Sequence, residues 1–368
     1  MKITIIGGGS AGLAAGIGAR QKLGADVTIL ERQAAGEAPG LGVALLRFAF
    51  NELRMAGLEG FTTQADGFAI GSEIGVFAGE HGRPFVRQTR RNEQQYWGVR
   101  RSTLLSFLTG AAEKAGVRIE YATDVTPDRI RAERADADLL VGADGAGSLV
   151  RGTYADEFMP TMAEAESRYA WLELEGRLTD FMFGYVLVPG AGLIRITAYP
   201  HSPTECSAIV THSAGLSATL DAPGMLDADG NITETALALL NDYFAAGLDG
   251  RRLKGTTRWR RFRATSCGRA ASGNAAIVGD AFATVHYETG WGTSAALQES
   301  RILMHILELS LRQRGESLDA ALGLFNRKAL ELSSGLVSEA LRVMRAIDSQ
   351  AALFAELGAA RFLEIETP

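Results

Sequence analysis

The hydrophobic and polar positions of this chain change their period several times along its length. Short continuous apolar runs at 2–6 and 26–30 are typical of strands buried on both faces of a parallel sheet. Between them, 13–23 is rich in Ala and Gly and has helical spacing. This order predicts a βαβ unit with a right-handed crossover. Helical spacing recurs at 45–55 and 102–115, and strands are predicted at 117–121 and 139–141.

A different pattern governs the middle of the chain. From about 169 to 263, alternating and aromatic segments separated by Gly, Pro and Ser predict strands. These strands are expected at 181–188, 193–199 and 206–211, with a helical insert at 233–244 and a hairpin turn at 79–82. After 279 the chain is predicted to be helical, with amphipathic runs at 294–313, 318–331 and 336–357.

These patterns predict an α/β protein with a Rossmann-like domain around a parallel sheet, a smaller β-rich α+β domain and a helical C-terminus. Two β-rich segments interrupt the α/β segments, so both domains are expected to be discontinuous in sequence. The predicted division is 1–72, 97–160 and 267–335 for the first domain, 73–96 and 161–266 for the second, and 336–368 for the C-terminal helical segment.

Composition excludes several classes of function. The net charge of −6 leaves no basic surface of the kind that binds nucleic acid or an anionic membrane. The N-terminal apolar run is shorter than a signal peptide requires, and no apolar run approaches the roughly 20 residues of a membrane span. With two cysteines, Cys206 and Cys267, the chain has no disulfide framework and is expected to be cytoplasmic. It shows no metal-binding spacing, so no metal is expected. A monomer or homodimer is expected.

The first candidate site is a glycine-rich turn between the first strand and the first helix. Gly7, Gly9, Ser10, Ala11 and Gly12 form a G-x-G-x-x-G sequence, which permits a tight turn and a close approach of the backbone to pyrophosphate. Glu31 ends the next strand, where an acid accepts a hydrogen bond from the adenosine ribose and disfavours a 2′-phosphate. The pattern predicts a dinucleotide site without distinguishing FAD from NAD, and a purely structural turn is the alternative.

A second glycine-rich turn lies nearly the whole sequence away. An apolar strand ends in Gly279-Asp280, and after a short loop Gly290-Trp291-Gly292-Thr293 opens a helix. A helix N-terminus of this kind favours an anion. Two such turns so far apart in the sequence suggest one long nucleotide held at both ends, which favours a flavin.

A third motif, Asp144-Gly145 after the strand at 139–141, makes the set specific. Taken together and in this order, the three motifs resemble those of the class A flavin monooxygenases, the flavoprotein aromatic hydroxylases. The resemblance covers residues 1 to about 300. In that family the Asp-Gly motif serves both FAD and the nicotinamide coenzyme, the Asp of the Gly-Asp motif holds the FAD ribitol, and an arginine in the position of Arg101 lies near the FAD phosphates.

The motifs and the resemblance therefore imply a set of FAD-binding residues. This set is Gly7, Gly9, Ser10, Ala11, Gly12, Glu31, Arg32, Arg101, Asp144, Gly279, Asp280, Gly290, Trp291, Gly292 and Thr293.

One loop departs from the common pattern of the family. Many members read Gly-Asp-Ala-Ala-His with a proline four residues later, whereas Phe282-Ala283 and Tyr287 stand here. His286-Tyr287 before the Gly-rich turn is similar to a branch that includes salicylyl-CoA hydroxylase and the violacein-pathway hydroxylases. His286 and Tyr287 are the candidate catalytic residues, with helix-end packing the alternative for His286.

The aromatic strands are expected to supply the substrate pocket. Its candidate residues are Phe181, Phe183, Arg195 and Tyr199, for which ordinary packing within the sheet is the alternative.

The resemblance implies an FAD-dependent monooxygenase that uses NADH or NADPH and O₂ to hydroxylate an electron-rich aromatic or heteroaromatic small molecule. In the family NAD(P)H reduces the flavin, O₂ adds at C4a, and the resulting hydroperoxide transfers one oxygen to the ring. Two enzymatic alternatives are a non-oxygenating FAD oxidoreductase and an epoxidase or hydroxylase fed by a separate reductase. A catalytically inactive nucleotide-binding protein is the non-enzymatic alternative.

Overall fold

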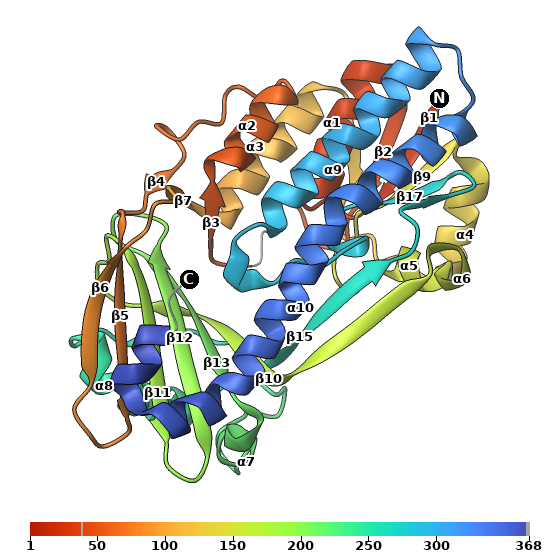
Figure 1. The fold of residues 1–368 in the computed structure, drawn as a ribbon. Coiled ribbons are helices and arrows are strands. Elements are labelled where there is room, and N and C mark those ends of the chain that lie inside the picture. Colours follow the sequence, from red (N-terminus) through yellow and green to blue (C-terminus); the bar gives the residue numbers. More distant parts are fainter. Residues whose placement is uncertain (38–39, 366–368) are drawn as a thin grey trace.

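The computed structural model describes residues 1–37 and 40–365 (Figure 1). Six strands form the first sheet, in the order β16-β17-β9-β1-β2-β8, and all pairs are parallel except β16 with β17. Their bounds are β1 Lys2–Ile6, β2 Asp26–Leu30, β8 Arg118–Glu120, β9 Leu139–Gly142, β16 Ala271–Ser272 and β17 Ala275–Ile277. The parallel order and the helices between the strands confirm the predicted Rossmann-like sheet.

Helices cover this sheet because their apolar sides bury against its continuous runs of Ile, Val and Leu. Their bounds are α1 Ser10–Gly18 continued by η1 Ala19–Leu23, α3 Arg101–Lys114, α4 Pro127–Asp136, α5 Leu149–Thr153, α6 Ala155–Phe158, and α9 Gly292–Leu307 continued by η5 Glu308–Gln313. Helix α9 lies directly against α1, where a side chain at Gly18 would meet Met304 at 2.9 Å. Nearer the first cofactor motif, Ser300 Oγ of α9 donates to the Ala11 carbonyl at 2.9 Å and holds the start of α1 against α9.

The second sheet is larger and mostly antiparallel, with the order β14-β10-β13-β12-β11-β5-β6 and with β15 paired to β10. Its strands are β5 Glu73–Glu80, β6 Val86–Arg91, β10 Pro160–Leu174, β11 Phe181–Val188, β12 Gly192–Pro200, β13 Cys206–His212, β14 Leu253–Lys254 and β15 Arg260–Cys267. Two short helices, η2 Ala214–Leu216 and α7 Ser217–Leu220, follow β13. The β5–β6 pair confirms the hairpin predicted at 79–82.

Alternation along β12 assigns the two faces of this sheet. Ile194 and Ile196 pack with helix α8 (Glu234–Leu248) on one face, where Phe244 also lies. Leu193 and Tyr199 belong to an aromatic cluster on the opposite face. The pocket-forming residues of the sheet therefore come from one set of alternating positions.

A third, small sheet corrects one prediction. The helix expected over 45–55 begins only at Arg47, as α2 Arg47–Met55, because the chain before it forms strand β3 Gly42–Leu46. This strand pairs with β7 Tyr96–Arg100, which also pairs with β4 Phe68–Ala69. The helical spacing was overridden by pairing with a strand some 50 residues away, a long-range contact that a local pattern does not contain.

The C-terminal helix spans two of the predicted amphipathic runs. The runs expected at 318–331 and 336–357 belong to one helix, α10 Leu318–Ile365, which bends at Gly358 (φ 71°). Ser333 and Ser334 do not end it, because each hydroxyl donates to a backbone carbonyl one turn earlier, that of Leu330 and Glu331 respectively. Figure 1 shows α10, in blue, running from the first sheet to the second.

The predicted division into domains stays a proposal, with its boundary after residue 335 inside α10. Residues 366–368 of the predicted C-terminal segment lie outside the described residues. None of the helices in the described ranges combines the length and the apolar character of a membrane span. The same ranges contain no cluster of three or more His, Cys, Asp or Glu side chains arranged to hold a metal ion.

Candidate active site

The turn between β1 and α1 has a backbone that requires glycine. Gly7 has φ 103°, in the left-handed region, and its N–H donates to the Leu30 carbonyl at 2.9 Å. A Cβ on Gly12 would lie 1.9 Å from the Gly7 oxygen. No side chain caps α1 at Gly9, so the N–H groups at Ser10 and Ala11 are left for a ligand.

Glu31 lies at the carboxyl end of β2 beside this turn. Its carboxylate accepts hydrogen bonds from the N–H groups of Gly8 (2.5 Å) and Gln33 (2.8 Å), which fix its orientation. Glu31 and the exposed Arg32 line a cavity of about 450 Å³ that continues past Gly7 and Gly9 to Arg101 and Asp144. The predicted adenosine acceptor thus lies at one end of an open cavity.

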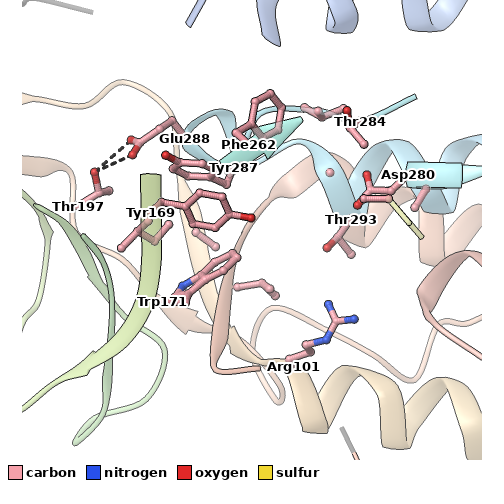
Figure 2. A pocket seen from close by; sticks show the side chains of 18 of the residues that line it. Arg101, Tyr169, Trp171, Thr197, Phe262, Asp280, Thr284, Tyr287, Glu288 and Thr293 are labelled. Atoms are coloured by element: carbon pink, nitrogen blue, oxygen red, sulfur yellow. Dashed lines mark hydrogen bonds between the residues drawn. The ribbon is translucent and has the colours of Figure 1, made fainter. Parts of the chain in front are cut away.

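A second cavity, of about 710 Å³, lies between the two large sheets (Figure 2). The two cavities share Gly9, Arg101, Ala143, Gly145 and Gly147 in their walls. Figure 2 shows Arg101, Asp280 and Thr293 on one side of the second cavity and Tyr169, Trp171 and Tyr287 on the other. The structure therefore brings the three separate sequence motifs to one continuous space.

Asp280 projects into the second cavity from the 3-10 helix η3 Gly279–Ala281. Its carboxyl points into the cavity and is surrounded by protein, and this desolvation raises its pKa to about 6. The charges of Arg101 and Arg151 oppose the rise. Gly279 has φ 62°, and its N–H donates to Glu299 Oε2 at 2.7 Å. Glu299 is buried on α9, and desolvation raises its pKa to about 8.

In the Asp-Gly motif, Asp144 forms hydrogen bonds with residues that follow it closely in the chain. Ser148 Oγ donates to Asp144 Oδ1 at 2.5 Å, and the N–H groups of Leu149 and Val150 donate to Oδ2 at 2.7 and 3.1 Å. Asp144 therefore caps the start of α5 while still lining the smaller cavity. Burial raises the pKa of its carboxyl.

Arg151 ties this loop to the Gly-Asp loop, a role that the sequence analysis did not assign. The guanidinium is buried and donates to the carbonyls of Ala146 (2.5 Å), Asp280 (3.2 Å) and Ala281 (2.9 Å). The sequence shows only an arginine in the short helix that follows the Asp-Gly motif. That signal does not specify carbonyls more than 100 residues away.

The start of α9 completes the cofactor side of the cavity. Gly290 has φ 68°, and no side chain caps the helix at Trp291. Gly292 and Thr293 line the cavity, so the positive end of the α9 dipole faces it. The Trp291 ring packs on Phe48, with 5.4 Å between ring centroids, and lies outside the cavity wall.

The second sheet supplies an aromatic wall. Phe181, Phe183 and Tyr199 line the cavity, as do Tyr169 and Trp171 from β10. Tyr199 Oη donates to the Gly42 carbonyl at 3.0 Å and links β12 to β3. Of the four residues predicted for the substrate pocket, Arg195 alone is not in the wall, because it lies behind Thr197 and Glu288.

The two candidate catalytic residues occupy different positions. Tyr287 lines the cavity, and its ring lies 4.4 Å from that of Tyr169 and its hydroxyl 3.1 Å from Thr211 Oγ1. His286 is 2% exposed, is absent from the wall, and accepts from the Glu288 N–H at Nδ1. Desolvation lowers the pKa of His286 to about 3, so the ring is neutral. This geometry favours the packing alternative for His286.

A dinucleotide with a ribitol linker requires N–H donors for its phosphates and acceptors for its hydroxyl groups. The site offers both: the two glycine-dependent turns and the two uncapped helix starts supply N–H groups, and an acidic residue at each end supplies an acceptor. The two cavities share part of their walls and together extend from Glu31 to the aromatic strands. The fold and the site together define an FAD-binding flavoprotein.

The comparisons agree with this class. The model of the FAD binding domain family matches residues 1–323, and the chain belongs to this family. A salicyloyl-CoA 5-hydroxylase of Streptomyces sp is 30% identical over 332 residues, which are 87% of this chain and 60% of that protein. A 3-hydroxy-4-methyl-anthranilyl-[aryl-carrier protein] 5-monooxygenase of Streptosporangium sibiricum is 30% identical over 309 residues, which are 83% of this chain and 79% of that protein.

A solved structure shares the fold. The tetrameric form of 2-methyl-3-hydroxypyridine-5-carboxylic acid oxygenase has a TM-score of 0.67 and 20% identity, covering 100% of this chain and 94% of that chain. The predicted resemblance to the class A flavin monooxygenases, and to the branch with the salicylyl-CoA hydroxylase, is confirmed. FAD as the cofactor is likewise confirmed.

Proposed function

We propose that this protein is an FAD-dependent monooxygenase that hydroxylates an electron-rich aromatic ring with NADH or NADPH and O₂. The observation that carries the proposal is the single cavity that joins the dinucleotide turns to an aromatic-lined space. When bound there, FAD supplies reduction by the nicotinamide and activation of O₂. The predicted cofactor residues, the two catalytic candidates and the division into domains are part of this proposal.

The chain's own residues hold the cofactor and shield the reaction. Glu31 accepts from the ribose, and the backbone at Ser10 and Ala11 donates to the pyrophosphate, with Arg101 beside it. Asp280 accepts from the ribitol, and the start of α9 stabilises negative charge at the flavin. Tyr169, Tyr287 and the β11–β12 aromatics hold a flat ring and exclude water from it.

We further propose that the substrate is an aromatic acyl group joined through a thioester to a phosphopantetheine carrier, either CoA or a carrier protein. The two relatives support this, since one is a salicyloyl-CoA hydroxylase and the other a monooxygenase of an anthranilyl group on an aryl-carrier protein. Arg260, Arg261 and Arg263 of β15 line the same cavity. Glu164 pairs with Arg261 at 3.8 Å and with Arg263 at 3.0 Å, and the positive charge that is left over suits a phosphate.

The test is oxygen incorporation. Purified, FAD-loaded protein should oxidise NADH or NADPH faster when an aryl-CoA thioester is added, and ¹⁸O from ¹⁸O₂ should appear in the ring. The free aryl acid is the control that shows whether the thioester is needed. The same acyl group on a carrier protein shows whether the enzyme acts on the CoA ester or on the carrier-bound form. Nicotinamide oxidation with no labelled product across hydroxy- and amino-aryl thioesters would contradict the proposal.

A further inference from the structure

Glu288 places a carboxylate inside the aromatic part of the cavity. It belongs to the 3-10 helix η4 Tyr287–Thr289, lines the cavity, and has a side chain that is 8% exposed. Burial of a charged group is costly unless partners compensate for the lost water. The roles proposed above use Tyr287 but leave Glu288 without one.

Two side chains of β12 hold this carboxylate. Arg195 Nη2 lies 3.2 Å from Glu288 Oε2, and Thr197 Oγ1 lies 3.2 and 3.1 Å from the two carboxylate oxygens. Arg195 and Thr197 are two positions apart on a strand and so share one face. The pair compensates the charge of Glu288 and sets its orientation.

A second layer holds Arg195 itself. Its guanidinium lies 5.5 Å from the centre of the Tyr185 ring, and Nη1 lies 3.2 Å from Gln350 Oε1 on α10. Arg195 is 7% exposed and does not reach the cavity wall. The cation is therefore placed to support Glu288 from behind, and Glu288 and Thr197 are the groups that meet a ligand.

The carboxylate has acceptor capacity left for a ligand. An ionised carboxylate offers about four lone-pair positions, and the Thr197 hydroxyl and the Arg195 guanidinium occupy about two of them. Figure 2 shows Glu288 and Thr197 on one side of the cavity and Asp280, Thr293 and Arg101 on the other. A ring between them meets a negative acceptor on its Glu288 side, which attracts an O–H or N–H donor and repels a carboxylate.

We propose that Glu288, positioned by Arg195 and Thr197, selects aromatic rings that carry a hydroxyl or amino donor. The inference rests on the proposed function of this cavity as the aromatic substrate site, and it names the chemical class of the ring. Glu288 is then a specificity-determining residue, and Arg195 is a positioning residue that acts through it.

The variants separate this role from a purely structural ion pair. Glu288→Gln keeps the side-chain volume but removes the charge that attracts a donor. Glu52→Gln is the matched control, because Glu52 forms a buried pair with Arg301 at 2.6 Å and neither residue lines the two cavities. Thr197→Val keeps the shape of its side chain and removes the hydroxyl that orients Glu288.

The experiment titrates the FAD-loaded protein with small aromatic probes and follows the change in flavin absorbance. Phenol with anisole and aniline with toluene are donor and non-donor pairs of similar shape. The wild type should bind each donor about tenfold or more tightly than its partner, as a hydrogen bond to a charged group provides. Glu288→Gln should lose most of that preference with little change for anisole and toluene, and Glu52→Gln should retain it.

The outcomes distinguish the two proposals. Equal binding of all four probes by the wild type, or an undiminished donor preference in Glu288→Gln, overturns the role of Glu288 and leaves the monooxygenase proposal standing. No flavin response to any probe, together with no aryl-stimulated nicotinamide oxidation, overturns both. If Glu288→Gln does not fold, Thr197→Val decides, because a reduced donor preference supports the inference and an unchanged one overturns it.

Discussion

The glycines of the dinucleotide turn differ in whether their surroundings leave room for a side chain. Gly12 faces backbone, since a Cβ there would lie 1.9 Å from the Gly7 oxygen, whereas a Cβ on Gly9 would meet nothing within 4 Å. Gly9 also lines both cavities. One glycine is therefore required by the fold, and the other by the space that the cofactor needs.

Substitution by alanine should separate these two requirements. Gly12→Ala forces a backbone shift and should lower the free energy of unfolding by about 1–3 kcal/mol or more. Gly9→Ala should leave the stability of the FAD-free protein near that of the wild type, because its Cβ points into the cavity, but should lower FAD affinity. Thermal unfolding and the flavin content after purification measure the two effects. A Gly12→Ala protein with wild-type stability and flavin content would contradict the assignment.

The buried Glu299 gives the protein a pH dependence of stability. Its pKa is raised to about 8 in the folded protein, from an ordinary value of 4.5. The folded state therefore binds more protons than the unfolded state between these pH values, so stability falls as pH rises through them. Glu299→Gln keeps an oxygen that can accept from the Gly279 N–H and removes the titration.

The expected result is a widening difference between two profiles. With a fixed excess of FAD, the wild type should lose stability relative to Glu299→Gln between about pH 5 and pH 8, by a few kcal/mol in total. Denaturant unfolding at several pH values measures it. Parallel profiles across this range would show that Glu299 does not carry a raised pKa.

At the scale of secondary-structure elements, α10 links the two sheets. Asn326, near its start, accepts from the Ala270 N–H at 2.7 Å beside the first sheet. Farther along, Asp348 accepts from the N–H groups of Glu166 (3.1 Å) and Ser167 (2.9 Å) of β10. The register of β10 against β15 shifts between Glu164 and Arg168. A carboxylate of the helix thus satisfies strand donors where the regular strand pairing is interrupted.

Removal of the Asp348 carboxylate should weaken this link. Asp348→Ala leaves two backbone donors without their acceptor and should cost about 1–3 kcal/mol of stability. Arg345→Ala, an exposed position on the same helix, is the control and should change stability by about 0.5 kcal/mol or less. Denaturant unfolding monitored by tryptophan fluorescence compares them. Equal stability of the two variants would show that Asp348 does not help to hold α10 against β10.

At the scale of the whole molecule, the site exists because two cavities meet. Arg101 stands at the start of α3 and lines both cavities. Burial raises the pKa of Asp280, and the charge of Arg101 partly opposes that rise. The neighbouring Arg100 instead pairs with Glu205. Adjacent arginines in the sequence therefore have separate roles in the molecule.

The two arginines make a matched pair for a test of cofactor binding. Arg101→Ala should weaken FAD binding by about tenfold or more, because a charged donor to the phosphates is lost. Arg100→Ala should leave FAD affinity near that of the wild type. Titration of the flavin-free protein with FAD, followed by quenching of flavin fluorescence, gives both dissociation constants. Equal affinities would place the phosphates away from Arg101.

Much of this molecule could be predicted from local patterns. Continuous apolar runs predicted β1, β2 and β9, and the spacing of Gly7 to Gly12 with Glu31 predicted the dinucleotide turn. The aromatic strands were expected to supply the pocket, and Phe181, Phe183 and Tyr199 line the larger cavity. The prediction failed at β3, because that strand depends on pairing with β7, a partner far away in the sequence.

The sequence by itself determined the dinucleotide turns, because such turns need glycine and acid at short, fixed separations, and the order of the three motifs indicated FAD and the family. Only the tertiary structure decided which residues line the larger cavity. It moved Arg195 and His286 behind the cavity wall, and brought Glu288 and Thr197 into it. The reason is physical: a turn is specified by neighbours in the chain, whereas a pocket is specified by the packing of β12, η4 and α10, as in the contact between Arg195 and Gln350, which are 155 residues apart.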